Sequence, residues 1–180
     1  MAEDTKLSSS VTVRRYHDLE KAADRPALAR FVVERFDERY FRPVEDSPSK
    51  HGFTSMAVAC LAIETLESFY QGRPDTKNES KQMFRDFFER ETPLRVFGGG
   101  GDWFYKDIRC GLLHQAEARG GWRIRRSGAL FDQAARTINA TAFLREVRRA
   151  VGVYARHLEQ EDESWTLFRD KMKAVCANCA

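Results

Sequence analysis

Arg109 and His114 are the two side chains of this sequence that are best suited to catalysis. They lie five residues apart in the otherwise apolar segment WFYKDIRCGLLHQAEARGGWRI, residues 103–124. A histidine, whose unperturbed pKa is about 6.5, can accept a proton from a ribose 2′-hydroxyl, and a guanidinium can stabilise charge on phosphate oxygens. The pair therefore predicts cleavage of RNA without a metal ion. The alternative is a core helix with a satisfied histidine.

The helix that carries this pair is expected to be capped by Asp102 and to end near Ala118. With about 100° per residue, its apolar face consists of Phe104, Tyr105, Ile108, Leu112 and Ala116. A different side of the same helix carries Trp103, Asp107, Cys110 and His114. Arg109 is about 140° from His114 on an ideal helix. Its long side chain, or the same helix of a second subunit, must therefore close that gap.

A carboxylate in the preceding apolar helix is the expected partner of Arg109. Glu67 projects into an angular range that it shares with Met56, Cys60, Ile63 and Tyr70. Burial of an unpaired carboxylate is costly, so we expect Glu67 to pair with Arg109, as a structural ion pair or as part of a site. Glu64 lies at the edge of that face and is the weaker candidate.

Basic residues gather in the later part of the chain. Between residues 119 and 156 there are nine arginines and two acidic residues, a charge of +7 within a net charge of +3. Guanidinium groups pair bidentately with phosphate, so this distribution is typical of a nucleic-acid-binding face, and the alternative is a solvated helix surface. The side chains expected to bind nucleic acid are Arg119, Arg123, Arg125, Arg126, Arg145, Arg148 and Arg149.

The hydrophobic spacing predicts one all-helical domain over residues 1–180, an antiparallel bundle with a small irregular or hairpin insert after the fourth helix. Residues 1–20 are expected to be flexible. The basic insert, residues 119–138, contains Ser127-Gly128 between WRIRR and ALF, which predicts a hairpin or a structured loop. The six helices are expected to begin at Asp24, at Thr54 or Ser55, near Asn78 or Ser80, at Asp102, at Asn139 and at Ser164.

Other classes of site lack their sequence signals. The glycine run at residues 98–101 is not followed by the Lys-Ser/Thr of a phosphate-binding loop, and no cofactor motif is found. Cys176 and Cys179 have metal-ligand spacing, but no second Cys or His pair completes a zinc site. The acidic start MAEDTKLSSS and the lack of a long apolar run predict a cytoplasmic protein with reduced cysteines and no membrane contact.

The segment RCGLLH, Arg109 to His114, follows an apolar helix, a short helix and a loop, and in this setting it resembles the motif of the HEPN (higher eukaryote and prokaryote nucleotide-binding) domains. The likeness spans roughly residues 54–158. It implies a metal-independent endoribonuclease that acts as a homodimer in a toxin, defence or RNA-processing role and leaves 2′,3′-cyclic phosphate ends. RNA, a second copy of the chain and an antitoxin-like protein are the partners that it implies.

Carried onto this sequence, the resemblance makes Arg109 and His114 the catalytic pair, with Glu67, Asp107 and Cys110 in supporting positions. Asp107 lies two turns before His114, so it could help the imidazole only across a dimer interface or through water. HEPN motifs usually have a polar residue after the arginine, where this chain has Cys110. A non-catalytic helical module for dimerisation, or for protein or nucleotide binding, is therefore the alternative. Neither function is expected to need a cofactor or a metal ion.

Overall fold

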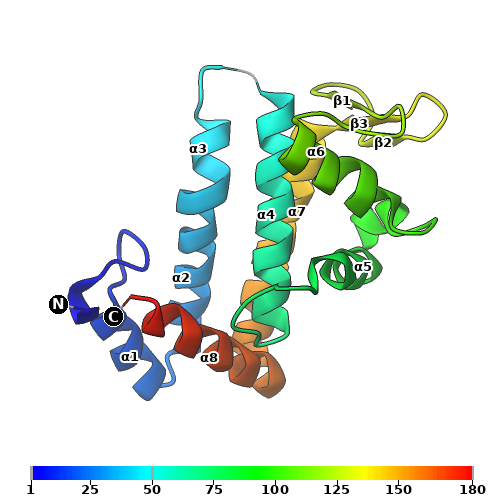
Figure 1. The fold of residues 1–180 in the computed structure, drawn as a ribbon. Helices are drawn as coiled ribbons and strands as arrows, with labels where there is room; N and C mark the ends of the chain where they lie inside the picture. Colours follow the sequence, from blue (N-terminus) through cyan, green and yellow to red (C-terminus); the bar gives the residue numbers. More distant parts are fainter. Residues whose placement is uncertain (1, 50, 180) are drawn as a thin grey trace.

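The computed structural model describes residues 2–49 and 51–179, which form a mostly helical fold with one small sheet. In Figure 1, α4 (Gly52–Tyr70) runs through the middle of the molecule with α7 (Ala140–Gln160) behind it. α2 (Arg25–Phe36) packs against α7, and α5 (Ser80–Arg90) packs against α4 on the opposite side. The prediction of a helical fold is confirmed, whereas the insert differs in topology from the predicted hairpin.

α2 begins at the predicted residue. The Asp24 carboxylate accepts a hydrogen bond from the backbone N–H of Ala27 at 3.0 Å, and Pro26 occupies the first turn. Beyond Phe36 the helical column continues through a π-helical segment, Asp37–Phe41, and α3 (Arg42–Glu45). The column therefore extends to Glu45, past the proline at residue 43.

α4 is buried around most of its circumference, as its composition predicts. Its start differs from the predicted cap at Thr54 or Ser55, because the helix already begins at Gly52. The Ser55 hydroxyl donates to the His51 carbonyl oxygen at 2.8 Å, so it stabilises the first turn from inside the helix. The largest apolar side chains that α4 and α7 bury are Met56, Ile63, Leu66, Phe69, Phe143, Leu144, Val147, Val151, Tyr154 and Leu158.

The N-terminal segment, predicted to be flexible over residues 1–20, packs against the bundle from Leu7 onward. α1 (Val13–Lys21) is capped by Thr12 and buries Val13, Tyr16 and Leu19. Tyr16 makes an edge-on contact with Phe168 of α8 (Asp162–Ala177), with 6.1 Å between the ring centroids. The helix is short, and its three buried apolar residues are a weak periodic signal, which is why the sequence pattern misses it.

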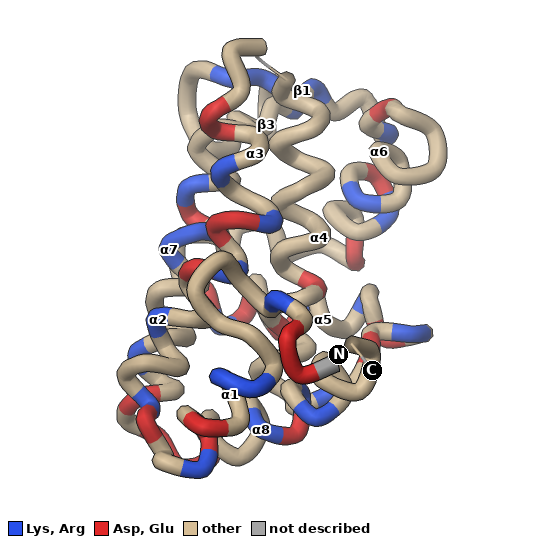
Figure 2. Tube along the Cα trace, turned by 90° about the vertical axis from the view of Figure 1, so that its left-hand side faces the viewer, with Lys and Arg blue, Asp and Glu red and all other residues tan. Residues whose placement is uncertain are grey.

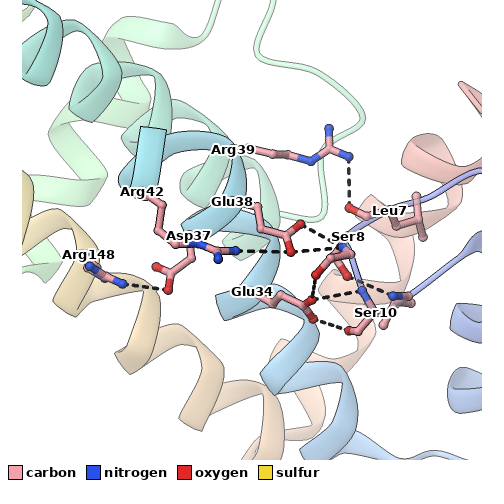
Figure 3. Close-up of polar contacts among 11 residues, drawn as sticks. Leu7, Ser8, Ser10, Glu34, Asp37, Glu38, Arg39, Arg42 and Arg148 are labelled. Atoms are coloured by element: carbon pink, nitrogen blue, oxygen red, sulfur yellow. Dashed lines mark hydrogen bonds and ion pairs between the residues drawn. The ribbon is translucent and has the colours of Figure 1, made fainter. Parts of the chain in front are cut away.

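Hydrogen bonds to α2 and to the segment that follows it hold the residues before α1 in place (Figure 3). The Glu34 carboxylate accepts hydrogen bonds from the hydroxyl of Ser9 and from the backbone N–H of Ser10. Partial burial acts to raise the pKa of Glu34, but the hydrogen bonds from Ser10 and Ser9 outweigh it and lower that pKa. The Arg39 guanidinium donates to the Leu7 carbonyl oxygen at 3.1 Å. These contacts explain why the segment is ordered despite its polar composition.

The helix that carries RCGLLH changes its winding near the middle. Residues Phe104–Arg109 are π-helical, and α6 (Cys110–Gln115) continues as an α-helix. The helix stops at Ala116, which adopts a left-handed backbone conformation with φ of 54°, two residues before the predicted end at Ala118. One wider turn changes the direction of every side chain that precedes it relative to those that follow.

Asp102 does not cap this helix, contrary to the sequence-based prediction. Its carboxylate instead accepts hydrogen bonds from the Arg85 guanidinium at 2.5 and 2.8 Å and pairs with Lys81 at 2.8 Å. These two partners hold the pKa of Asp102 well below its usual range. Asp102 therefore ties the glycine loop to α5, because two cations compete successfully with the backbone N–H groups of the helix.

The insert after α6 is a three-stranded sheet rather than the predicted hairpin. β1 (Arg123–Arg125) and β2 (Phe131–Asp132) do not pair with each other, because β3 (Thr137–Asn139) lies between them. β3 runs parallel to β1 and antiparallel to β2. Asn139 then caps α7, as predicted, by accepting from the backbone N–H of Ala142, and it also donates to the Gly128 carbonyl oxygen. One side chain thus joins the sheet to the long helix.

α8 begins at Asp162, two residues before the predicted cap at Ser164. The Ser164 hydroxyl donates to the Glu161 carboxylate at 2.8 Å, so it is not available to a backbone N–H group. Among the described residues, no helix combines the length and the apolar character that crossing a membrane would require.

Candidate active site

Glu64 of α4 is the carboxylate that holds Arg109. The Arg109 Nε donates to Glu64 Oε1 at 2.8 Å, and Nη2 donates to Oε2 at 3.3 Å, which is a bidentate pair. The Glu64 side chain is 8% exposed and that of Arg109 is 16% exposed. The prediction that Glu67 pairs with Arg109 is therefore wrong, and the candidate judged weaker from the sequence is the partner.

The pair neutralises the charge of Arg109 and leaves part of its guanidinium available. Partial burial acts to lower the pKa of Arg109, but the hydrogen bond and the charge of Glu64 outweigh it and raise that pKa. A guanidinium has five N–H donors, of which Glu64 takes two. Within the part of the chain that the structure describes, Nη1 of Arg109 has no hydrogen-bond partner. Its N–H groups are therefore available to an anion.

Glu67 belongs to a different set of contacts, on the α5 side of α4. It is completely buried and pairs with Arg90, whose guanidinium lies over the Tyr70 ring at 3.7 Å from its centroid. Arg90 also lies 3.7 Å from Glu91, the next residue along the chain. Glu67 therefore joins α4 to α5 and lies outside the surroundings of Arg109.

An apolar groove runs between α4 and α6. It encloses about 330 Å³ and is lined by Phe53, Thr54, Ala57, Val58, Leu61, Leu112 and Ala116. Glu64 lies one turn beyond Leu61 on α4, and Arg109 lies one turn before Leu112, so the ion pair lies at one end of this groove. The groove and the ion pair together form one surface feature, which we call the α4–α6 groove.

Two of the four large apolar side chains that are exposed among the described residues line this groove. Phe53 is 40% exposed and Leu61 is 42% exposed, whereas Leu113, 38% exposed, lies on α6 outside the lining, and Val96 lines a different pocket. Contiguous exposed apolar side chains of this kind mark interaction sites more often than free surface. The α4–α6 groove is therefore a candidate interface.

His114 is exposed at the end of α6, beside Leu113. It is two residues from Leu112 and two from Ala116, and on an α-helix that spacing directs it away from the groove that these two residues line. No hydrogen bond or ion pair joins it to Arg109 in the described structure. Within the described part of a single chain, therefore, no polar contact brings the two side chains together, and the predicted angle between them stays a prediction.

The other predicted supporting residues are placed differently. Cys110 is partly buried at the start of α6, next to Arg109. Asp107 lines a separate pocket with Trp103, which the sequence places on the same side of the helix. Within residues 2–49 and 51–179, no three His, Cys, Asp or Glu side chains are grouped so that they could hold a metal ion.

The predicted nucleic-acid-binding arginines divide into two groups. Arg148 pairs with Asp37 at 2.8 Å and with Glu45, while Arg149 pairs with Glu146 at 2.9 Å and Glu91 at 3.4 Å. In Figure 2, basic segments of α7 accordingly lie next to acidic segments. Of the predicted arginines, those that are exposed and have no ion pair with a described residue are Arg119, Arg123, Arg125, Arg126 and Arg145.

These five arginines remain candidates for binding a polyanion, and three of them lie on or directly after β1. Arg126 also packs its side chain close to Gly52, at the start of α4. The exposed basic side chains of the insert are therefore near the end of the α4–α6 groove that contains Phe53 and Thr54. Arg148 and Arg149 instead contribute to packing between helices.

Comparison of this chain with family models, with curated protein sequences and with solved structures finds no match. The function is therefore argued from the geometry of the α4–α6 groove and from the chemistry of its residues.

Proposed function

We propose that this protein is a metal-independent endoribonuclease of the HEPN-like type that acts as a homodimer. The observation that carries the proposal is the Glu64–Arg109 pair, which holds a charged guanidinium at the end of an exposed apolar groove with N–H groups unused. An ion pair that only supports the fold needs no exposed apolar surface beside it. A site that a second chain completes needs such a surface, because the second chain must bind there.

The second chain brings His114 to Arg109. Leu113 is an exposed apolar side chain at the end of α6, and the groove is an exposed apolar surface on the same chain. In a twofold dimer, the end of each α6 can enter the groove of its partner, since such interfaces are reciprocal. Leu113 then becomes buried, and the adjacent His114 comes close to the arginine at the end of the partner's groove.

The chemistry follows from these two groups. His114 takes the proton of the ribose 2′-hydroxyl, the 2′-oxygen forms a bond to phosphorus, and the bond from phosphorus to the 5′-oxygen breaks. The leaving 5′-oxygen takes a proton from solvent. Arg109 donates its free N–H groups to the phosphorus oxygens, where charge increases in the transition state, while Glu64 fixes the plane of the guanidinium. The products are a 2′,3′-cyclic phosphate and a 5′-hydroxyl.

Incubation of the purified protein with single-stranded RNA in EDTA tests the proposal. We expect cleavage with 2′,3′-cyclic phosphate ends, and we expect His114→Ala to slow it by about 100-fold or more, the usual contribution of a general base. His17→Ala is the matched control, because His17 is exposed on α1, away from the groove. Equal residual cleavage by wild type and His114→Ala would eliminate the mechanism.

The second candidate is a non-catalytic module in which the same groove binds a partner and Arg109 only supports the fold. The exposure of Phe53 and Leu61 favours it, because an apolar groove needs an occupant whether or not RNA is cleaved. The same assay separates the two functions. A dimer that leaves RNA intact in the presence and absence of EDTA would support the module and exclude the enzyme.

A further inference from the structure

A second cavity, of about 720 Å³, lies between the glycine loop, the helix that carries Arg109 and the sheet. It is separate from the α4–α6 groove, since the groove is lined by Leu112 and the cavity by Asp107. The cleavage chemistry described above uses none of its side chains. We call it the tryptophan pocket and define it by Trp103, Asp107, Trp122, Phe131 and Arg136.

Three nearly parallel aromatic rings form the wall of the tryptophan pocket. Trp103 and Trp122 stack with 4.2 Å between centroids and 20° between planes. Phe131 lies 5.6 Å from Trp122 at 24° and 5.9 Å from Trp103 at 30°. All three rings are only partly buried. A partly exposed stack of parallel rings offers a face on which another planar ring, such as a nucleobase, can stack.

Asp107 provides a hydrogen-bond acceptor beside this wall. Among the residues that the structure describes, none donates a hydrogen bond or an ion pair to its carboxylate. Gly120 leaves room for it, because a Cβ at that position would lie 2.9 Å from Asp107 Oδ2, and the φ of Gly120 is 64°. The glycine at position 120 thus lets the backbone pass close to a carboxylate that has no described donor. An acceptor held in this way needs a donor from a ligand or from water.

Arg136 gives the pocket a cation at its rim. Its Nη1 donates to the Gly120 carbonyl oxygen at 2.6 Å, which fixes the side chain across the opening. The side chain is exposed and has no ion pair with a described carboxylate. The pocket therefore combines an aromatic wall, one carboxylate and one guanidinium, which are complementary to a planar base, to its N–H donors and to a phosphate.

We propose that the tryptophan pocket binds a guanine base. Guanine is the nucleobase whose Watson–Crick edge offers two adjacent donors, N1–H and N2–H, to a carboxylate, which accepts both at once. Adenine and cytosine place an acceptor next to their single amino group, and uracil has carbonyl oxygens on both sides of its N–H. Each of these faces an unfavourable contact with Asp107, so only guanine satisfies the carboxylate.

If RNA is the substrate, as the proposed function on which this step rests requires, the pocket selects the cleavage site. Asp107 and His114 are seven residues apart on one continuous helix, about two turns of it. An RNA strand with a guanine in the pocket thus places a phosphodiester within a few nucleotides of His114. We expect the cut sites to lie at a fixed short distance from guanines.

Binding of mononucleotides to the whole chain tests the inference without any cleavage. The probes are GMP, AMP, CMP, UMP and inosine monophosphate, and the readout is quenching of tryptophan fluorescence in a Trp165→Phe background, which leaves Trp103 and Trp122. We expect GMP to bind about tenfold or more tightly than the other four nucleotides. Each of those has at least one N–H donor fewer for the charged Asp107 carboxylate. Inosine monophosphate differs from GMP only in lacking the 2-amino group. It therefore removes one donor from the ligand while the protein stays unchanged.

Asp107→Asn should reduce the preference for GMP over AMP to less than about threefold, since an amide offers one acceptor where the carboxylate offers two. Asp18→Asn is the matched control, because Asp18 is an exposed carboxylate on α1. Thermal melting establishes that both variants are folded. Equal affinities for the five nucleotides, or no quenching by any of them, would overturn the guanine pocket.

An oligonucleotide of uridines with one central guanosine distinguishes RNA from a free nucleotide as the source of the base. Binding about tenfold tighter than GMP assigns the base to RNA. Equal binding assigns it to a free nucleotide and removes the link to the cut site. Guanine preference without RNA cleavage contradicts the proposed function alone, and cleavage without guanine preference contradicts the pocket alone.

Discussion

Glu64 balances the charge of Arg109 and fixes its direction. The two side chains are mostly buried and share two hydrogen bonds, so the guanidinium plane is fixed before any ligand arrives. Removal of one partner from such a pair leaves the other charge buried without compensation, which costs far more than the pair contributes. The same contact therefore determines both the stability of the fold and the reactivity of the site.

We expect Glu64→Ala to lower the free energy of unfolding by about 3 kcal/mol, because Arg109 then remains partly buried without its counter-charge. Urea denaturation monitored by circular dichroism measures it. Glu159→Ala is the control, since Glu159 is exposed near the end of α7 and should change stability by less than about 0.5 kcal/mol.

The double variant Glu64→Leu with Arg109→Met should be more stable than either single variant, because two apolar side chains leave no unpaired charge. A Glu64→Ala protein as stable as the Glu159→Ala control would mean that the pair is not needed to hold Arg109. The positioning role assigned to Glu64 would then be wrong.

The sequence does not determine which glutamate of α4 pairs with Arg109. Glu64 and Glu67 are three residues apart on one helix, and helical spacing alone places both near the same face. The angle at which α6 crosses α4 decides which of them meets Arg109, and the π-helical turn before Arg109 changes that direction. Neither feature has a local sequence signal, whereas the separation of Arg109 from His114 follows directly from their spacing.

At the level of secondary structure, the end of α6 is fixed by close backbone contacts. A Cβ at Gly111 would lie 2.5 Å from the Glu117 carbonyl oxygen, so the chain after the helix folds back directly over this glycine. The Arg119 N–H donates to the Asp107 carbonyl oxygen at 2.8 Å in the same region. This return of the chain brings Trp122 to Trp103 and so forms the tryptophan pocket.

Gly111→Ala should therefore destabilise the protein by about 1–3 kcal/mol, because backbone atoms must move to admit the methyl group. Gly152→Ala on α7 is the matched control: its Cβ would meet nothing within 4 Å, and alanine should stabilise that helix by up to about 1 kcal/mol. Thermal melting compares the two. A Gly111→Ala protein as stable as the Gly152→Ala protein would contradict the close return of the chain.

The helices that have clear caps and long periodic patterns are predictable from the sequence. Asp24 and Asn139 cap α2 and α7 as expected, since each side chain has a free backbone N–H within reach. Asp102 and Ser164 fail as caps because Arg85 and Glu161 attract their side chains. The three-stranded sheet is missed because its strands have only two or three residues, and because β1 pairs with β3 rather than with the next strand along the chain. Strands this short have no periodic signal of their own.

At the level of the whole molecule, the core is well buried, but part of the surface is apolar and exposed. Most of the phenylalanines are buried in one core, whereas Phe53 and Leu61 of the α4–α6 groove and Leu113 at the end of α6 are exposed. A protein that buries its core this completely exposes such a surface where a partner binds. In our proposal the partner is a second copy of the chain, and the arrangement joins Arg109 of one copy to His114 of the other.

Mixing two inactive variants tests this arrangement most directly. Arg109→Lys keeps a charge beside Glu64 but loses the bidentate geometry, and His114→Ala removes the base. If each site combines Arg109 of one protomer with His114 of the other, a mixed dimer has one site with both native side chains. Subunit exchange between the two variants should then restore about a quarter of wild-type RNA cleavage in EDTA, because half of the dimers are mixed and each has one intact site of two. A mixture no more active than the mean of its two components would contradict the account.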